Sequence, residues 1–163
     1  MATVEASWPA VADVETAFRD AQDRFCRALE SVDGGSFSVD RWERPGGGGG
    51  ETRVLSGDGP IEQAAVNVSA VHGPTPATLG ERMAGVVGHE FYATGLSIIV
   101  HPVNPHAPTF HANVRHFRSG DAAWFGGGAD LTPYYLYDED AVDFHRAIAD
   151  VCDRHEVADH AAW

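Results

Sequence analysis

The chain has 163 residues, a hydrophobic fraction of 44% and a formal net charge of −13. This length and composition allow one domain with a hydrophobic core. All 11 basic residues are arginines. The acidic balance argues against nucleic acid and against an anionic membrane surface as partners, because both demand a basic face.

No segment approaches the roughly 20 apolar residues of a membrane helix. The N-terminal sequence MATVEASWPAVADVE lacks the basic and apolar regions of a secretion signal. We therefore expect a cytoplasmic protein without membrane insertion. Cys26 and Cys152 are far apart in the chain, and we predict buried free thiols rather than a disulfide.

The first half of the chain begins with a predicted helix over residues 10–32, where apolar residues recur three and four apart and Gly34 follows. The glycine-rich tract 45–59 is interpreted as a loop within one domain, with a flexible interdomain linker as the alternative. Alternation over 61–72 predicts a strand, and 78–88 are predicted to form a short helix.

The second half contains two strand-like runs, 96–101 and 110–117, separated by the turn-rich sequence PVNPHAPT. Such a connection suggests an antiparallel pair. An amphipathic helix is predicted over 138–157, with acidic residues in its first turn. Because helices and strands do not alternate regularly, we predict an α+β fold with an antiparallel sheet flanked by helices, in a single domain over 1–163.

Residues two apart on a strand share a face, and this rule predicts a polar patch. His111, Asn113 and Arg115 would share one face of their strand, and Ser97 and His101 one face of the neighbouring strand. A solvated outer face is the alternative. Because these side chains serve proton transfer and anion binding, we favour a functional site.

Several chemistries fit this patch. Arg115 can bind a carboxylate or phosphate, or form an ordinary salt bridge. His111 can act as a general acid or base, or be structural. His101 and His111, joined by His145 from the last helix, could form a three-imidazole metal site. His106 would face the other side of a regular strand.

The stretch WFGGGADLTPYY, residues 124–135, has neither of the glycine patterns of nucleotide-binding loops. Its glycines instead allow the close approach of a flat ligand or another strand. Asp130 could face that space, or could bond Thr132 within a turn.

Two long segments, GLSIIVHPVNPHAPTFHANVRHF and WFGGGADLTPYYLYDEDAVDFH, resemble the oxygen-dependent coproporphyrinogen III oxidases. The resemblance extends from about residue 14 to the end of the chain. It implies a flat antiparallel sheet with helices on both faces, assembled as a homodimer. It also implies that two propionates of coproporphyrinogen III become vinyl groups, with O2 as co-substrate and protoporphyrinogen IX as product. No organic cofactor is implied, and a divalent metal accompanies some members.

The resemblance also implies roles for particular residues. His111 matches a proton donor, and Asp130 matches an aspartate that binds or deprotonates the pyrrole nitrogens. The substrate-binding positions are Ser97, Asn113, Val114 and Arg115, and the metal positions are His101, His111 and His145.

The chain departs from the family pattern at Ala123, where a second tryptophan is usual, and in being shorter than family members. The resemblance therefore implies an N-terminal part of the domain, with an incomplete sheet and little or no activity of its own. A non-catalytic tetrapyrrole-binding protein and a metallohydrolase built on the three histidines are the alternatives.

Overall fold

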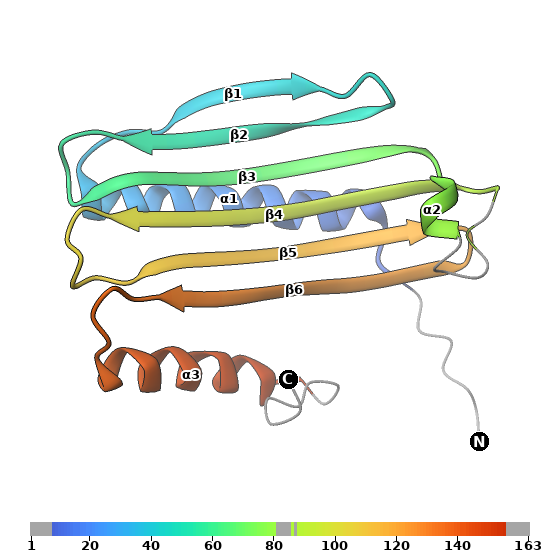
Figure 1. Cartoon of the computed structure of the whole chain (residues 1–163). Helices are drawn as coiled ribbons and strands as arrows, with labels where there is room; N and C mark the ends of the chain where they lie inside the picture. Colours follow the sequence, from blue (N-terminus) through green and yellow to red (C-terminus); the bar gives the residue numbers. More distant parts are fainter. Residues whose placement is uncertain (1–7, 81–85, 87, 156–163) are drawn as a thin grey trace.

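The computed structural model describes residues 8–80, 86 and 88–155. It contains one six-stranded antiparallel sheet in which neighbours in sequence are neighbours in space, in the order β1-β2-β3-β4-β5-β6 (Figure 1). The predicted α+β fold with an antiparallel sheet is confirmed. The strands are β1 Ser38–Glu43, β2 Gly48–Ser56, β3 Ile61–Pro74, β4 Glu90–Pro102, β5 Thr109–Ser119 and β6 Ala122–Thr132; the helices are α1 Val11–Asp33, α2 Ala77–Gly80 and α3 Asp138–Cys152.

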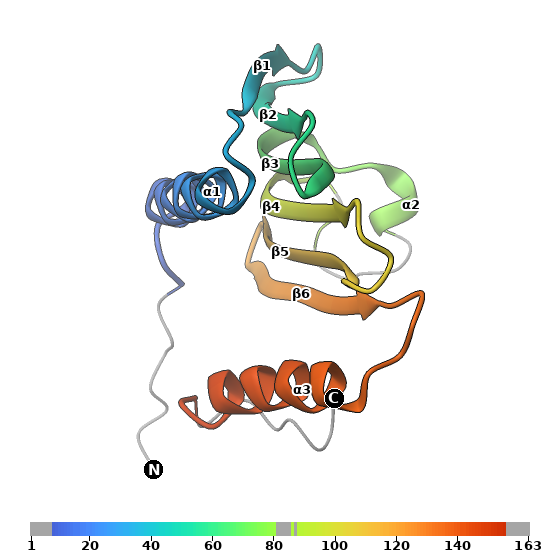
Figure 2. The ribbon, with the colours of Figure 1, turned by 90° about the vertical axis from the view of Figure 1, so that its left-hand side faces the viewer.

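The helices take different places around the sheet. Helix α1 runs along one face, α2 lies on the opposite side near one end, and α3 lies beside the edge strand β6 (Figures 1 and 2). The main core forms between α1 and the central strands, from the buried side chains of Cys26, Val66, Val68, Leu96 and Ile98. The face of the sheet that α1 covers therefore forms the hydrophobic core.

Helix α1 is fixed at its end and at its middle. It ends at Gly34, whose φ of 82° places it in the left-handed region while its N–H donates to the Glu30 carbonyl. The buried Gln22 donates through Nε2 to the carbonyls of Glu51, at 3.1 Å, and Val66, at 2.9 Å. These bonds tie the helix to β2 and β3 and hold it in register over the core.

The prediction of a loop over 45–59 is wrong for most of that tract, because Gly48–Ser56 form strand β2. The glycines are needed by the pairing on either side. A Cβ on Gly49 would lie 2.3 Å from the Trp42 carbonyl oxygen, and one on Gly50 would lie 2.5 Å from the Trp42 ring. Incorporation into the sheet also excludes a flexible linker at this place.

The other elements follow the sequence with different bounds. The predicted helix over 78–88 is described only as α2, Ala77–Gly80, and most of the remainder lies outside the described residues. Helix α3 ends at Cys152, earlier than predicted. Cys26 and Cys152 are buried free thiols, as predicted. No helix in the described part of the chain is long and apolar enough to cross a membrane.

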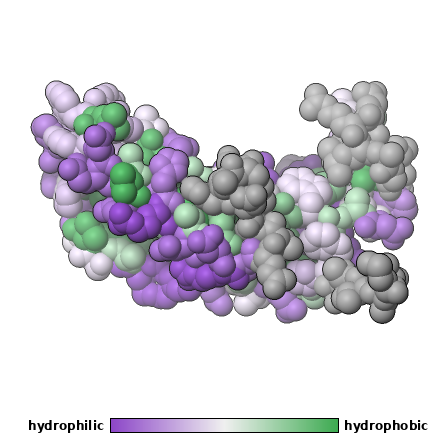
Figure 3. All heavy atoms as spheres, turned by 90° about the horizontal axis from the view of Figure 1, so that it is seen from below, coloured by the Kyte–Doolittle hydropathy of each residue, from purple (hydrophilic) through white to green (hydrophobic). Residues whose placement is uncertain are grey.

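Seen from the side of α3 and β6, the surface is mainly hydrophilic, with hydrophobic residues scattered among the polar ones (Figure 3). Acidic residues of α3 contribute to this character, beginning with Asp138, Glu139 and Asp140 in its first turn. Their carboxylates lie at the positive end of the helix dipole, which stabilises the start of α3.

We expect Gly127→Ala to lower the free energy of unfolding by about 1–3 kcal/mol through overpacking. A Cβ at this position would lie 2.3 Å from the Asn113 carbonyl oxygen and 3.1 Å from the Val114 Cα, so β6 must shift away from β5. Gly128→Ala is the matched control, because nothing lies within 4 Å of its Cβ. Urea unfolding of both variants checks this, and equal stabilities would contradict it.

Candidate functional site

A row of polar residues crosses the sheet on the face opposite α1. The register pairs Thr52 with Asn67, Asn67 with Ser97, Ser97 with Asn113, and Asn113 with Gly128. Directly paired residues of antiparallel strands lie on the same face. The predicted polar patch is therefore present on one face, and it extends further across the sheet, to β2 and β3, than the sequence indicated.

A depression of about 500 Å³ lies over this row. Its lining includes Thr52, Asn67, Ser97, Asn113 and Arg115. The chain has 24 acidic residues, yet none of the described residues that line the depression is Asp or Glu. Arg115 is the one charged side chain in that lining. In so acidic a protein, this concentration of hydrogen-bond donors without carboxylates favours an anionic ligand.

Arg115 has small neighbours and one oriented partner. It pairs with Gly95 on β4 and with Gly126 on β6, so no cross-strand side chain stands directly beside it. Its Nη2 donates to the Asn113 Oδ1 at 3.1 Å. This bond leaves most of the guanidinium donors available, in the fork geometry that suits a carboxylate.

His111 and Asp130 form a hydrogen-bonded pair where β5 meets β6. They are directly opposite in the register, and the His111 Nδ1 lies 2.8 Å from the Asp130 Oδ1. The hydrogen bond from His111 is the largest cause that lowers the pKa of the Asp130 carboxyl below its ordinary value. Because a carboxylate only accepts, Nδ1 carries the proton and Nε2 is left for a ligand.

Asp130 also accepts a hydrogen bond from Thr132 Oγ1, at 3.2 Å. The contact between Asp130 and Thr132 that the sequence suggested is thus present, and Asp130 also contacts His111. Both bonds reach the same oxygen, Oδ1, so Asp130 is held in a fixed orientation while its side chain stays 60% exposed.

The three histidines predicted as metal ligands are only partly brought together. The rings of His101 and His111 lie 5.9 Å apart between centroids, edge to face. His145 lines a separate cavity of about 280 Å³ between β6 and α3, which Asp130 also lines. Within residues 8–80, 86 and 88–155, no group of three His, Cys, Asp or Glu side chains is arranged to hold a metal ion.

His106 has a role that the sequence did not indicate. Its Nδ1 lies 2.5 Å from the Tyr137 hydroxyl, and its ring stacks on Tyr135 at 4.7 Å between centroids. These contacts join the β4–β5 loop to the connection between β6 and α3. Since the partners are 31 residues apart, no local spacing rule could reveal them.

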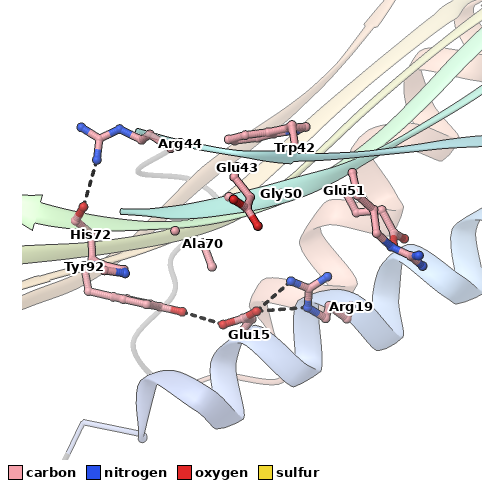
Figure 4. A pocket seen from close by; sticks show the side chains of 13 residues that line it. Glu15, Arg19, Trp42, Glu43, Arg44, Gly50, Glu51, Ala70, His72 and Tyr92 are labelled. Carbon is pink, nitrogen blue, oxygen red and sulfur yellow. Dashed lines mark hydrogen bonds and ion pairs between the residues drawn. The ribbon is translucent and has the colours of Figure 1, made fainter. Parts of the chain in front are cut away.

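A second cavity, of about 760 Å³, is lined by charged residues of α1, β1 and β2 (Figure 4). Glu15 accepts from the Tyr92 hydroxyl at 2.9 Å and from Arg19 at 2.8 Å, while Arg44 donates to the His72 carbonyl. Burial, and then the bond to Glu15, raises the pKa of Tyr92 to about 12. The bond from Tyr92 to Glu15 links β4 to α1, whereas the Arg19–Glu15 contact lies within α1 and the Arg44–His72 contact joins the β1–β2 connection to β3.

The sequence is similar to known proteins over most of its length. The profile of the family described as coproporphyrinogen III oxidase matches residues 13–163. The oxygen-dependent coproporphyrinogen-III oxidase of Prochlorococcus marinus (strain MIT 9313) is 51% identical over 135 residues. The match covers 81% of this chain but 38% of that relative, so the chain spans well under half of the relative's length.

We expect His111→Ala to raise the pKa of the Asp130 carboxyl toward the ordinary aspartate value, because the substitution removes the hydrogen bond that most favours the ionised form. Thr132→Val should raise it less, since Thr132 contributes a weaker hydrogen bond. Carbon-13 NMR titration of the side-chain carboxyl measures both.

The sign of the pH dependence follows from this lowered pKa. The pair stabilises the fold fully above the ordinary carboxyl pKa, and the contribution is lost as the pH falls through the lowered value. An Asp130 pKa that is the same in wild type and in His111→Ala would show that the two side chains do not interact in solution.

Proposed function

Because the chain belongs to the coproporphyrinogen III oxidase family, we propose that it forms part of the active site of an oxygen-dependent coproporphyrinogen III oxidase. In each of two steps, a propionate, O2 and one proton would give a vinyl group, CO2 and hydrogen peroxide. The carbon–carboxylate bond and one C–H bond of the carbon next to the ring break, and O2 takes up the two electrons that the side chain loses, together with two protons. The product would be protoporphyrinogen IX, an intermediate of haem synthesis.

The observation that carries this proposal is the depression over the polar row. It offers Arg115 and several neutral donors and, among its described lining residues, no carboxylate. A substrate with four propionates needs such an environment, since an Asp or Glu directly beside a bound propionate would repel it. The open face also supplies the flat surface that a large macrocycle requires.

We assign the acid–base step to His111. Asp130 fixes Nδ1 as the protonated nitrogen, so Nε2 can exchange a proton with the substrate beside the reacting propionate. The Oδ1 of Asp130 is engaged by His111 and Thr132. Its other oxygen, Oδ2, could accept a pyrrole N–H, which is the role that the family resemblance gives to this aspartate.

Substrate contacts are assigned to Ser97, Asn113, Val114 and Arg115, all of which line the depression. Val114 pairs with the core residue Leu96, so its side chain lies on the α1 face and its contact with the ligand would be through the backbone. Arg115 would bind a propionate through two of its donors. Gly128 lies across from Asn113 on the same face. A Cβ there would meet nothing within 4 Å, so this glycine leaves room for the macrocycle.

For a divalent metal, the proposed ligands remain His101, His111 and His145. Their arrangement does not make a three-ligand group in the described part of the chain, and we assign no step to a metal. We also propose a cytoplasmic homodimer. Support for the dimer comes from the edge strands β1 and β6 of the described sheet, whose outer backbone groups can pair further.

The activity is tested by incubating the chain with coproporphyrinogen III in air and following protoporphyrin fluorescence. We expect the chain to bind the substrate. Turnover should appear when the unmatched segment of the Prochlorococcus relative is added as a separate polypeptide. Absence of binding would contradict the proposed function. Binding without turnover in that mixture would support the non-catalytic tetrapyrrole-binding protein instead.

We expect Arg115→Gln to weaken binding of coproporphyrin III by about 10- to 100-fold, because a charge-assisted pair with a carboxylate is lost. Arg118→Gln is the matched control. Arg118 lies three residues further along β5 and is exposed, but it does not line the depression. Fluorescence titration measures both affinities, and equal losses would show that only the overall charge of the chain matters.

A further inference from the structure

Asn67 occupies the middle of β3 on the open face of the sheet. Its sequence neighbours, Val66 and Val68, are fully buried in the core beneath α1. A shift of one residue in the pairing of β3 with its neighbouring strands would exchange the two faces and expose both valines. The core therefore holds Asn67 in the polar row, between Thr52 and Ser97.

The carboxamide of Asn67 has no hydrogen-bond partner in the described structure. Its Oδ1 is buried without a partner, whereas the residue as a whole is half-buried and lines the depression. Because the oxygen is turned inward, Nδ2 is the end of the amide that faces the depression. An apolar side chain would fill this position without a buried, unsatisfied oxygen, so the fold alone does not explain an asparagine.

The surroundings of Nδ2 indicate which ligand group it would bind. The hydroxyl of Ser97 lies directly across on β4 and is exposed. With no carboxylate in the described lining, these donors favour an acceptor that carries negative charge. A carboxylate has enough acceptor positions for the amide and the hydroxyl together.

This position is distinct from that of Arg115. From the sheet geometry, two strand spacings and two residues along a strand put the Cα atoms of Asn67 and Arg115 about 12 Å apart. The guanidinium of Arg115 is also oriented by Asn113. The depression therefore has two donor clusters at separate points.

We propose that Asn67 Nδ2 donates to a second carboxylate of the ligand, beside the Ser97 hydroxyl, and so forms a carboxylate subsite separate from Arg115. The inference rests on the proposed function, because a tetrapyrrole with four propionates can occupy both clusters at once. Asn67 would then help to set the orientation of the macrocycle over β3, β4 and β5.

The test compares Asn67→Leu, Asn67→Asp and the control Gln63→Leu by titration with coproporphyrin III and by urea unfolding. Gln63 is exposed on the same strand and does not line the depression. We expect Asn67→Leu to weaken binding about 10- to 150-fold, as for one lost hydrogen bond to a charged group. Its stability should be unchanged or higher. Asn67→Asp should bind more weakly still, because its charge repels the carboxylate, and Gln63→Leu should bind normally.

Wild-type affinity in either Asn67 variant would overturn the proposal. A loss of binding in Asn67→Leu that accompanies a matching loss of stability would assign Asn67 a structural role and also overturn it. If Asn67→Leu does not fold, the affinity of the near-isosteric Asn67→Asp variant for coproporphyrin III tests the proposal alone. A wild-type chain that does not bind coproporphyrin III would remove the proposed function and this subsite together, whereas a binding wild type with insensitive variants removes the subsite only.

Discussion

The register of the antiparallel sheet is the constraint on which the rest of the structure depends. Packing of α1 against the central strands fixes which side chains face inward, including Val66 on β3 and Leu96 on β4. Since side chains alternate strictly along a strand, the same packing turns Asn67 and Ser97 to the opposite face. The hydrophobic core thus determines the geometry of the polar row, although the two lie on opposite faces of the sheet.

Electrostatics favours the binding of an anion that we propose for the polar face. A net charge of −13 would oppose the approach of an anionic ligand over most of the surface. In the depression, the one described charge, that of Arg115, lies among amide, hydroxyl and apolar groups, with no carboxylate in the described lining. Nearby, the carboxylate of Asp130 is engaged by His111 and Thr132 rather than turned wholly to the ligand. The site can therefore combine an acid–base pair with anion binding in an acidic protein.

The sequence predicted the parts of the structure that depend on local alternation. The two-residue period placed His111, Asn113 and Arg115 on one face, and the register confirms this. The prediction of a loop for the glycine-rich tract was wrong. The run of glycines suggested a loop, but these residues form a strand in which close packing against Trp42 requires glycine. The His106–Tyr137 contact was beyond prediction as well, because it depends on how two distant connections fold against each other.

The stretch WFGGGADLTPYY shows why a glycine run alone does not indicate its purpose. Gly127 is confined by the backbone of β5, so its lack of a side chain serves strand pairing. Gly128 has open space above it on the polar face, so its lack of a side chain is not required by strand packing and keeps that face clear. Adjacent residues of the same type thus meet different requirements because they point to opposite faces. The third, Gly126, lies beside Arg115, and a Cβ there would lie 3.0 Å from the Trp124 ring. The role of each glycine in this run depends on the residue of β5 with which it pairs. The glycines themselves do not specify that pairing, so their roles cannot be predicted from the run alone.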